Sequence, residues 1–223
     1  MQVKQANLST ISVIMCFLLV PFLMGTAIDL YVPSLPFIVQ HFHTQQHLTQ
    51  LTISLYMLGY GVGQLSLGIL SDSIGRKKIL VSGALLFTIA SLLAAHSANI
   101  YILISYRFLQ GIGMAGMGAM SRTIAVDCYS GSKLSSLMTY YAASWAIGPL
   151  IGPFIGANLQ HFFNWQANFY FFSAFSFVIV LISVFSFHET LLQQHILNLK
   201  TITKNIFTVI THTEFIVCAC TAA

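Results

Sequence analysis

A succession of long apolar stretches constrains this 223-residue chain more than any other feature. Each stretch reaches the roughly 20 residues that a helix needs to cross the hydrocarbon core of a bilayer. We expect crossings near 9–32, 49–70, 78–96, 100–124, 133–157 and 166–187. The stretches are continuously apolar, which favours helices over the alternating strands of a barrel. Charged residues make up only 6% of the chain, against roughly 25% in soluble domains. The predicted fold class is an all-α integral membrane protein.

The distribution of charge predicts the topology. Basic residues precede the first crossing and follow the second, fourth and sixth: Lys4, Arg76, Lys77, Lys78, Arg122, Lys133, Lys200 and Lys204. The connections at 37–48, 97–99 and 158–165 contain no charged residue. By the positive-inside rule, the N-terminus and the loops near 75, 128 and 195 lie in the cytoplasm, and we expect a multi-pass protein of a bacterial inner membrane. Topology thus accounts for the net charge of +4, and nucleic acid is not an expected partner.

Two features have more than one interpretation. Residues 1–27 combine Lys4, an apolar run and the small residues GTA, as a signal peptide does. We favour a retained helix because the apolar run is long and the charge alternation requires it. The four cysteines lie within crossings or on the cytoplasmic side, where disulfides are rare: Cys16, Cys128, Cys218 and Cys220.

Asp29 and Arg107 are charges that topology does not explain, because they lie within crossings. An ionised side chain at the bilayer centre costs about 2.5–3.5 kcal/mol on insertion scales, so such residues usually face a cavity and find a partner. Both fall in the outward half of their helices, at depths that would let them interact. The sequence favours an ion or substrate site, and a purely structural polar pair is the alternative.

Small residues recur every four positions along the fifth crossing, on one face: Ser144, Gly148, Gly152 and Gly156. This pattern predicts close contact with another helix in lipid. Pro149 and Pro153 stand one position further on, and each removes a backbone hydrogen bond. They favour a deformable interface, while ordinary tight packing is the alternative. Gly59 and Gly63 form a shorter ridge that packing alone would explain.

Four motifs stand in a characteristic order. GILSDSIGRKK (68–78) carries a loop signature of six residues with one departure, Ser73: Gly68, Asp72, Gly75, Arg76, Lys77 and Lys78. RFLQGIG (107–113) carries a second signature in Arg107, Gln110, Gly111 and Gly113. GPLIGPFIG (148–156) supplies a third, in the fifth crossing, and IDLYVPSLP (28–36) a fourth. HET (188–190) stands after the sixth crossing.

These motifs resemble the major facilitator superfamily, and specifically its drug/proton antiporter branch of the bicyclomycin-resistance (Bcr/CflA) type. The resemblance covers residues 10 to 190. It implies two six-helix halves around a cavity, each an inverted pair of three-helix repeats. This chain would supply the six-helix N-terminal domain (1–190), the central cytoplasmic loop (191–213) and the truncated start of a seventh helix (214–223).

The resemblance also implies roles for motif residues. Asp29 would carry either a proton or a cationic drug, and Arg107 would bias its protonation. The loop around Asp72 would latch the cytoplasmic side by pairing with Arg76 and with a helix of the other half, while Gly68 lets helices approach. The glycine ridge of the fifth crossing would likewise pack against the other half.

Several functions remain open at this point. The resemblance implies proton-coupled efflux of small drugs or other lipophilic compounds by alternating access. A half-transporter that needs a C-terminal half on another chain, a truncated remnant without transport, a homodimer and a solute importer are the alternatives. The sequence does not identify the substrate, and Tyr31, Tyr56 and Met114 are candidate substrate-lining residues.

No enzyme or cofactor signature is found, so we expect no cofactor. The proton is the expected coupling ion, and the bilayer and a small-molecule substrate are the expected partners. Gly111 and Gly113 lie inside a membrane helix and not after a strand, which argues against a nucleotide loop. His41, His43 and His47 cluster in QHFHTQQH, where His43 and His47 would share a helical turn. Without a nearby carboxylate or cysteine, a neutral polar loop is favoured over a metal site.

Overall fold

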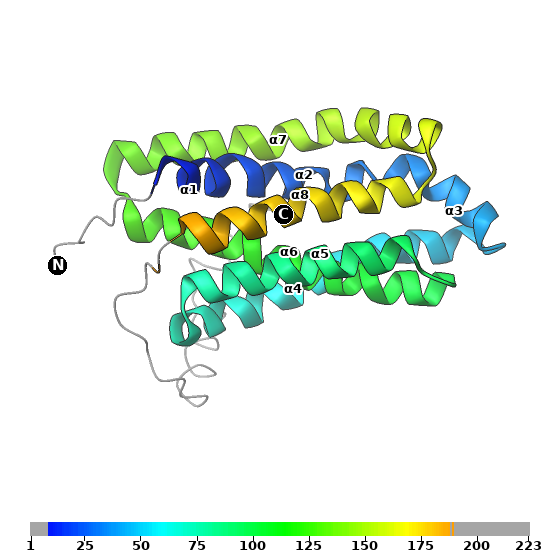
Figure 1. The fold of residues 1–223 in the computed structure, drawn as a ribbon, viewed down its shortest axis with the longest axis horizontal. Coiled ribbons are helices and arrows are strands. Elements are labelled where there is room, and N and C mark those ends of the chain that lie inside the picture. The colour runs from blue at the N-terminus through cyan, green and yellow to red at the C-terminus, as the bar shows by residue number, and fades with distance from the viewer. Residues whose placement is uncertain (1–8, 188, 190–223) are drawn as a thin grey trace, which may run out of the picture.

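The computed structural model describes residues 9–187 and 189, and it is a bundle of long helices that lie side by side (Figure 1). These helices are α4 (Gln46–Ile74), α5 (Arg76–Ala95), α6 (Ile100–Cys128), α7 (Gly131–Phe162) and α8 (Gln166–Ser186). No strand occurs in the described part of the chain. The all-α prediction is therefore confirmed. The predicted central loop and seventh helix lie outside the described residues.

The first crossing is built from several short pieces. They are α1 (Thr10–Ile14), a π-helical turn η1 (Met15–Leu19), α2 (Val20–Asp29), a 3₁₀ turn η2 (Val32–Ser34) and α3 (Leu35–His41). The predicted loop at 37–48 is wrong in extent, because helix continues to His41 and resumes at Gln46. Pro36 did not stop the helix because it stands in its first turn, where the missing N–H is no loss.

The π-helical turn η1 is anchored by two neighbouring helices. The Ser121 hydroxyl of α6 donates to the Cys16 carbonyl, and the Ser144 hydroxyl of α7 donates to the Leu18 carbonyl at 2.6 Å. A π turn disturbs the regular backbone ladder. Its carbonyls therefore gain partners in this place from serine side chains across the helix contacts.

Hydropathy and length together qualify four segments as membrane spans within the described residues. They are Ile11–His41, Gln46–Ile74, Arg76–Ala95 and Gln166–Ser186. Helices α6 and α7 are as long, at 29 and 32 residues, and run beside the others (Figure 1). Helix α6 is largely buried against its neighbours.

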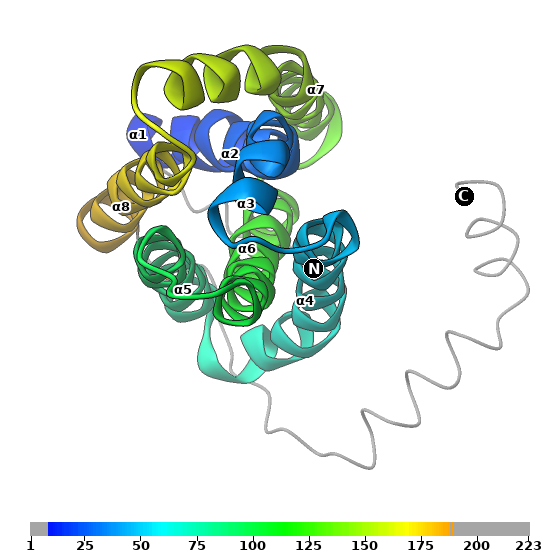
Figure 2. The ribbon, with the colours of Figure 1, turned by 90° about the vertical axis from the view of Figure 1, so that its right-hand side faces the viewer.

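The pairs of helices with the most extensive contacts fit a bundle of two three-helix repeats. The most extensive pairs are α4 with α6, α5 with α6, α2 with α7 and α5 with α8. Counted as crossings, the first packs on the fifth and the second on the fourth. If crossings one, two and three correspond to crossings four, five and six, the pair of first and fifth corresponds to the pair of fourth and second. The end-on view in Figure 2 shows α6 between α4 and α5, with α2 beneath α7. These two pairs fit a division into two three-helix repeats, and whether the repeats are inverted stays a prediction.

Glycines bring α6 close to both of its neighbours. A Cβ at Gly59 of α4 would overlap the Phe108 carbonyl, and one at Gly113 of α6 would come within 2.7 Å of the Gly83 carbonyl. A Cβ at Gly63 would meet that of Ala115 at 2.7 Å. Only the absence of side chains allows these approaches. The tight packing expected at Gly59 and Gly63 is confirmed.

The glycine ridge of α7 packs inside this chain, against α2. A Cβ at Gly148 would come within 2.6 Å of the Gly25 Cα, and one at Gly156 would overlap the Leu30 carbonyl. The expectation that this ridge packs against a second half is therefore wrong. The ridge is the buried face of α7, while Pro149 and Pro153 lie on the exposed face.

We expect Gly156→Ala to lower the thermal stability of the detergent-solubilised protein, because its Cβ would collide with backbone that has no free space to move. Overpacking of this kind costs about 1–3 kcal/mol. Gly61→Ala is the matched control, since nothing lies within 4 Å of the place that its Cβ would take, and alanine is the better helix former. Thermal unfolding of both variants checks this. An equal effect of the two would contradict close α2–α7 contact.

Candidate functional site

Arg76 joins three elements at one end of the bundle, where α4 turns into α5. Its Nη1 donates to Asp72 Oδ1 at 2.7 Å and to the Ser71 hydroxyl, and its Nε donates to Asp127 Oδ2 at 3.2 Å. The Arg76 side chain is only 11% exposed. Two carboxylates and a hydroxyl therefore fix one guanidinium, which ties the end of α6 to the α4–α5 turn.

Glu189 closes the same turn from the end of α8. Its carboxylate accepts the backbone N–H groups of Arg76 at 2.9 Å and Lys77 at 3.2 Å. These are orphan donors of the first turn of α5, where a negative charge is favourable. Gly75 has φ +112°, and a Cβ there would meet the Glu189 carboxylate at 2.5 Å. The backbone conformation thus requires glycine, and a side chain at this position would also displace the Glu189 carboxylate.

The structure brings together part of the predicted latch. Asp72 and Arg76 form the ion pair that was expected, and Gly75 makes the turn. Lys78 is exposed, and nothing lies within 4 Å of a Cβ built at Gly68. Sequence reasoning missed two partners, Asp127 and Glu189. The signal for Asp127 was its place at the end of a crossing, on the same side of the membrane as the motif.

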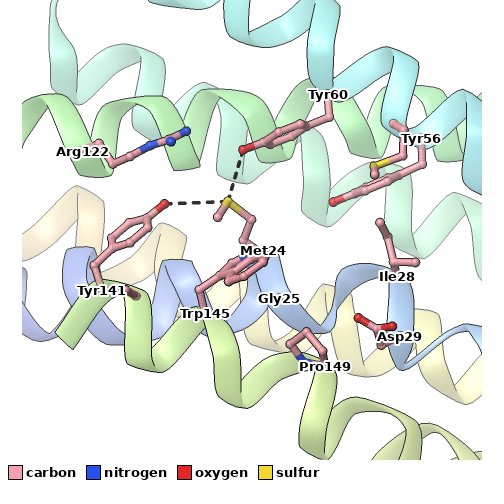
Figure 3. A pocket seen from close by; sticks show the side chains of 12 residues that line it. Met24, Gly25, Ile28, Asp29, Tyr56, Tyr60, Arg122, Tyr141, Trp145 and Pro149 are labelled. Atoms are coloured by element: carbon pink, nitrogen blue, oxygen red, sulfur yellow. Dashed lines mark hydrogen bonds between the residues drawn. The ribbon is translucent and has the colours of Figure 1, made fainter. Parts of the chain in front are cut away.

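A cavity of about 430 Å³ opens between α2, α4, α6 and α7 (Figure 3). Its walls are mostly aromatic and apolar. They are formed by Met24, Gly25, Ile28, Asp29, Tyr56, Met57, Tyr60, Arg122, Tyr141, Ala142, Trp145 and Pro149. This volume lies within the range of small-molecule sites.

The two charged residues of the cavity lie at opposite ends (Figure 3). Asp29, the last residue of α2, is half-buried. Arg122 of α6 is exposed at the other end, and its Nε donates to the Gly118 carbonyl of its own helix at 3.3 Å. Neither residue forms an ion pair within the described part of the chain. Both charges are therefore available to a ligand.

Polar groups gather around Met24 near the Arg122 end. The hydroxyls of Tyr60 and Tyr141 donate to the Met24 sulfur at 3.3 and 3.8 Å (Figure 3). Gln64 Nε2 donates to the Tyr60 hydroxyl at 2.6 Å. This end of the cavity is consequently rich in hydrogen-bond donors.

Arg107 is fully buried behind the cavity wall. Its guanidinium lies 4.6 Å from the ring centroid of Tyr31 and 4.5 Å from that of Tyr56. It donates to Gln110 Oε1 at 2.9 Å and to the Ala27 carbonyl at 3.3 Å. Two aromatic faces and two neutral oxygens thus stabilise the charge, with no carboxylate within ion-pair distance in the described residues.

A buried hydrogen-bond chain extends from Arg107 into α5. Gln110 Nε2 donates to the Ser91 hydroxyl at 2.6 Å, and that hydroxyl donates to the Phe87 carbonyl at 2.7 Å. The fourth-crossing motif therefore polarises one line of groups between α6 and α5. Asp29 and Arg107 do not pair directly here. The Tyr56 ring lines the cavity together with Asp29 and also lies over the Arg107 guanidinium.

Of the three residues predicted to line a substrate site, one lines the cavity. Tyr56 lines the cavity, whereas Tyr31 and Met114 are fully buried and do not. Pro149 contributes a wall, and Gly152 packs on Asp29 from α7. The other nine lining residues were missed, among them Met24, Tyr60, Arg122, Tyr141 and Trp145. Helical spacing was an available signal for some of them. Tyr56 and Tyr60 are four apart, as are Tyr141 and Trp145.

The histidine cluster has no metal-site geometry. No group of three metal-ligating side chains occurs among the described residues. His43 has φ +47° in the turn after α3, and His47 lies in the first turn of α4. The expectation that these two share a helical turn is therefore wrong.

Comparisons with known proteins agree with this fold. Residues 17–216 match the Major Facilitator Superfamily. The chain is 34% identical over 166 residues to an uncharacterised MFS-type transporter, YdgK, of Bacillus subtilis, covering 74% of this chain and 41% of that protein. It is 29% identical over 177 residues to the multidrug resistance protein MdtL of Salmonella paratyphi B, covering 79% and 45%. The chain thus spans less than half the length of these relatives.

Solved structures share the fold at low sequence identity. The peptide transporter POT, in complex with alafosfalin, superposes with a TM-score of 0.72 at 13% identity, covering 95% of this chain and 46% of that one. The human organic anion transporter MFSD10 gives a TM-score of 0.66 at 18% identity, covering 81% and 48%. In both cases this chain corresponds to about half of the partner structure.

We expect Arg76→Gln to lower thermal stability, because it leaves Asp72 and Asp127 without their shared cation. Hydrogen bonds to charged groups contribute about 1.5–3 kcal/mol. Lys78→Gln removes an exposed charge two residues away and serves as the control, with an expected change within about 0.5 kcal/mol. Thermal unfolding in detergent measures both. If Lys78→Gln destabilised as much as Arg76→Gln, the charge network would not be what fixes this end.

Proposed function

The chain belongs to the Major Facilitator Superfamily, and on that premise we propose that it acts in proton-coupled efflux of small lipophilic compounds, as the N-terminal half of a transporter of the bicyclomycin-resistance type. One observation carries the proposal. The cavity holds a single carboxylate, Asp29, among aromatic walls, and that carboxylate has no ion-pair partner in the described residues.

Such a carboxylate supports an exchange of proton for cation. When it is ionised, Asp29 attracts a cationic group, and the faces of Tyr56, Tyr60 and Trp145 favour cations and apolar rings. When it is protonated, the attraction is lost and the cation leaves. Either species occupies the same site, so a proton entering from one side drives a cation out to that side.

The proton gradient supplies enough free energy for this exchange. It amounts to about 1.36 kcal/mol per pH unit and about 2.3 kcal/mol per charge for each 100 mV of membrane potential. Arg107 acts at a distance in this scheme, through the Tyr56 ring that separates it from the cavity. Its positive charge attracts negative charge at that end of the cavity.

The charged end of the bundle supports a cytoplasmic assignment. The α4–α5 turn, the α6–α7 turn and the end of α8 lie at one end (Figure 1), and they carry Arg76, Asp127 and Glu189. The connections at the opposite end contain no charged residue. The N-terminus and this charged end therefore face the cytoplasm of a bacterial inner membrane in our proposal.

Large apolar side chains on α4 and α7 support assembly with a second half. Leu65 of α4 is 74% exposed, and Leu150 and Phe154 of α7 are 78% and 72% exposed. Both helices also contribute lining residues to the cavity. We infer that six further helices, on this or another chain, cover these faces of α4 and α7 and alternate access to the cavity. A non-transporting remnant is the outcome to exclude.

Binding of tetraphenylphosphonium to the purified chain tests the carboxylate. We expect affinity to rise with pH, because the cation needs Asp29 ionised, and we expect Asp29→Asn to weaken binding about tenfold and to flatten the pH dependence. Asp29→Glu keeps the acid and should keep the pH dependence. An unchanged pH dependence in Asp29→Asn would contradict the proposal.

Accumulation of a lipophilic cation in energised cells tests transport itself. The chain is produced alone or with the C-terminal half of the Bacillus subtilis relative as a second polypeptide. We expect lower accumulation than in empty cells in at least one case, and we expect an uncoupler to remove this difference. Increased accumulation would favour an importer, and no change in either case, with both polypeptides in the membrane, would favour the remnant.

A further inference from the structure

Arg122 gives the cavity a second chemical character that proton–cation exchange does not use. It lines the cavity from α6, at the end away from Asp29 (Figure 3). Its Nε makes a long hydrogen bond to the Gly118 carbonyl, at 3.3 Å, and its guanidinium forms no ion pair in the described residues. The two Nη groups therefore face no carboxylate of the described chain, and a guanidinium offers them to a ligand acceptor as a planar pair.

Two tyrosine hydroxyls beside Arg122 point at a poor acceptor. Those of Tyr60 and Tyr141 both donate to the thioether sulfur of Met24. Sulfur of this kind accepts hydrogen bonds only weakly. A carboxylate or carbonyl oxygen entering here would be a better acceptor for both hydroxyls and for Arg122. Donors converge on a place where the described chain provides no carboxylate, and where the acceptors are the Met24 sulfur and the Tyr60 hydroxyl.

The two ends are separated by an apolar middle. Met24 and Asp29 are five residues apart on α2, which is about 7.5 Å along a helix. Ile28, Tyr56 and Trp145 line the space between these levels (Figure 3). One aromatic ring system with short substituents spans this distance.

The fixed charges of the cavity sum to zero when Asp29 is ionised. A purely cationic ligand satisfies Asp29 and leaves Arg122 facing a like charge, whereas a purely anionic ligand does the reverse. A ligand that carries both charges pairs each of them in a partly desolvated site. Complementary charge of this kind gives specificity, because mismatched charges are penalised.

We propose that this cavity selects amphoteric compounds, with a protonated amine at Asp29, a carboxylate or similarly strong acceptor at Arg122, Tyr60 and Tyr141, and an apolar body between them. The inference rests on the proposed function and names its substrate class. Arg122 is then a specificity-determining residue.

The test uses three matched probes and the purified chain. The probes are 4-(aminomethyl)benzoic acid, its methyl ester, which is only cationic, and its N-acetyl form, which is only anionic. Trp145 reports binding by fluorescence quenching, because it lines the cavity and is 46% exposed. Trp165, the other tryptophan, is 3% exposed and lines no part of the cavity.

We expect the amphoteric acid to bind at least tenfold more tightly than either single-charge probe. Arg122→Gln should remove that advantage and bring the acid to the affinity of the ester, whose own affinity changes less than threefold. Arg122→Lys keeps a cation and should restore part of the advantage. Lys133→Gln removes a charge outside the cavity, over the Tyr129 ring, and should leave the ranking of the probes unchanged.

Two results would overturn the inference. One is equal binding of acid and ester by the unchanged chain, and the other is an equal loss for both in Arg122→Gln. If the ester still bound with a dependence on Asp29, the proposed function would stand and only the substrate class would fail. If no probe bound and no cell accumulation changed, the proposed function itself would fail.

Discussion

Close backbone contact at glycines is the interaction on which the rest of this structure depends. Lipid is as apolar as the helices, so no hydrophobic force drives them together, and packing at short distance has to hold the bundle. Gly148 meets Gly25 across the α2–α7 contact, and Gly111 meets the Tyr60 backbone across the α4–α6 contact. The two tightly joined pairs then leave room between them. The cavity occupies that room, and Gly25 itself lines it.

The charged side chains of this molecule differ in how completely other protein groups pair them. Arg76 is saturated by carboxylates at the charged end, where it fixes a turn. Arg107 is buried among rings and neutral oxygens, which keep a cation in place without cancelling its field. Asp29 and Arg122 are left without ion-pair partners in the described residues and face the cavity. Both charges are therefore open to pairing with a ligand.

The fold and part of the site could be predicted from the sequence, for physical reasons. Apolar length predicts crossings, and charge alternation predicts which loops share an end, because both act locally along the chain. Asp29, Tyr56 and Pro149 are predicted site residues that line the cavity. Partners across the bundle were not predictable: the α7 ridge suits any helix with a small-residue face, and only the fold selects α2. Arg122 was attributed to topology because a cation near a helix end satisfies that rule whether or not it faces a cavity.

The π-helical turn at Met15–Leu19 sets the direction in which the later side chains of the first crossing point. A π turn accommodates one residue more than an α turn, and one residue corresponds to about 100° of rotation in an α-helix. The orientation of Asp29 therefore depends on the extra residue of the π turn, about ten residues upstream. Removing one residue from this turn would rotate the carboxylate out of the cavity while leaving its depth in the bilayer almost unchanged. The serine hydroxyls that hold the turn from α6 and α7 thus help to fix the direction in which Asp29 points.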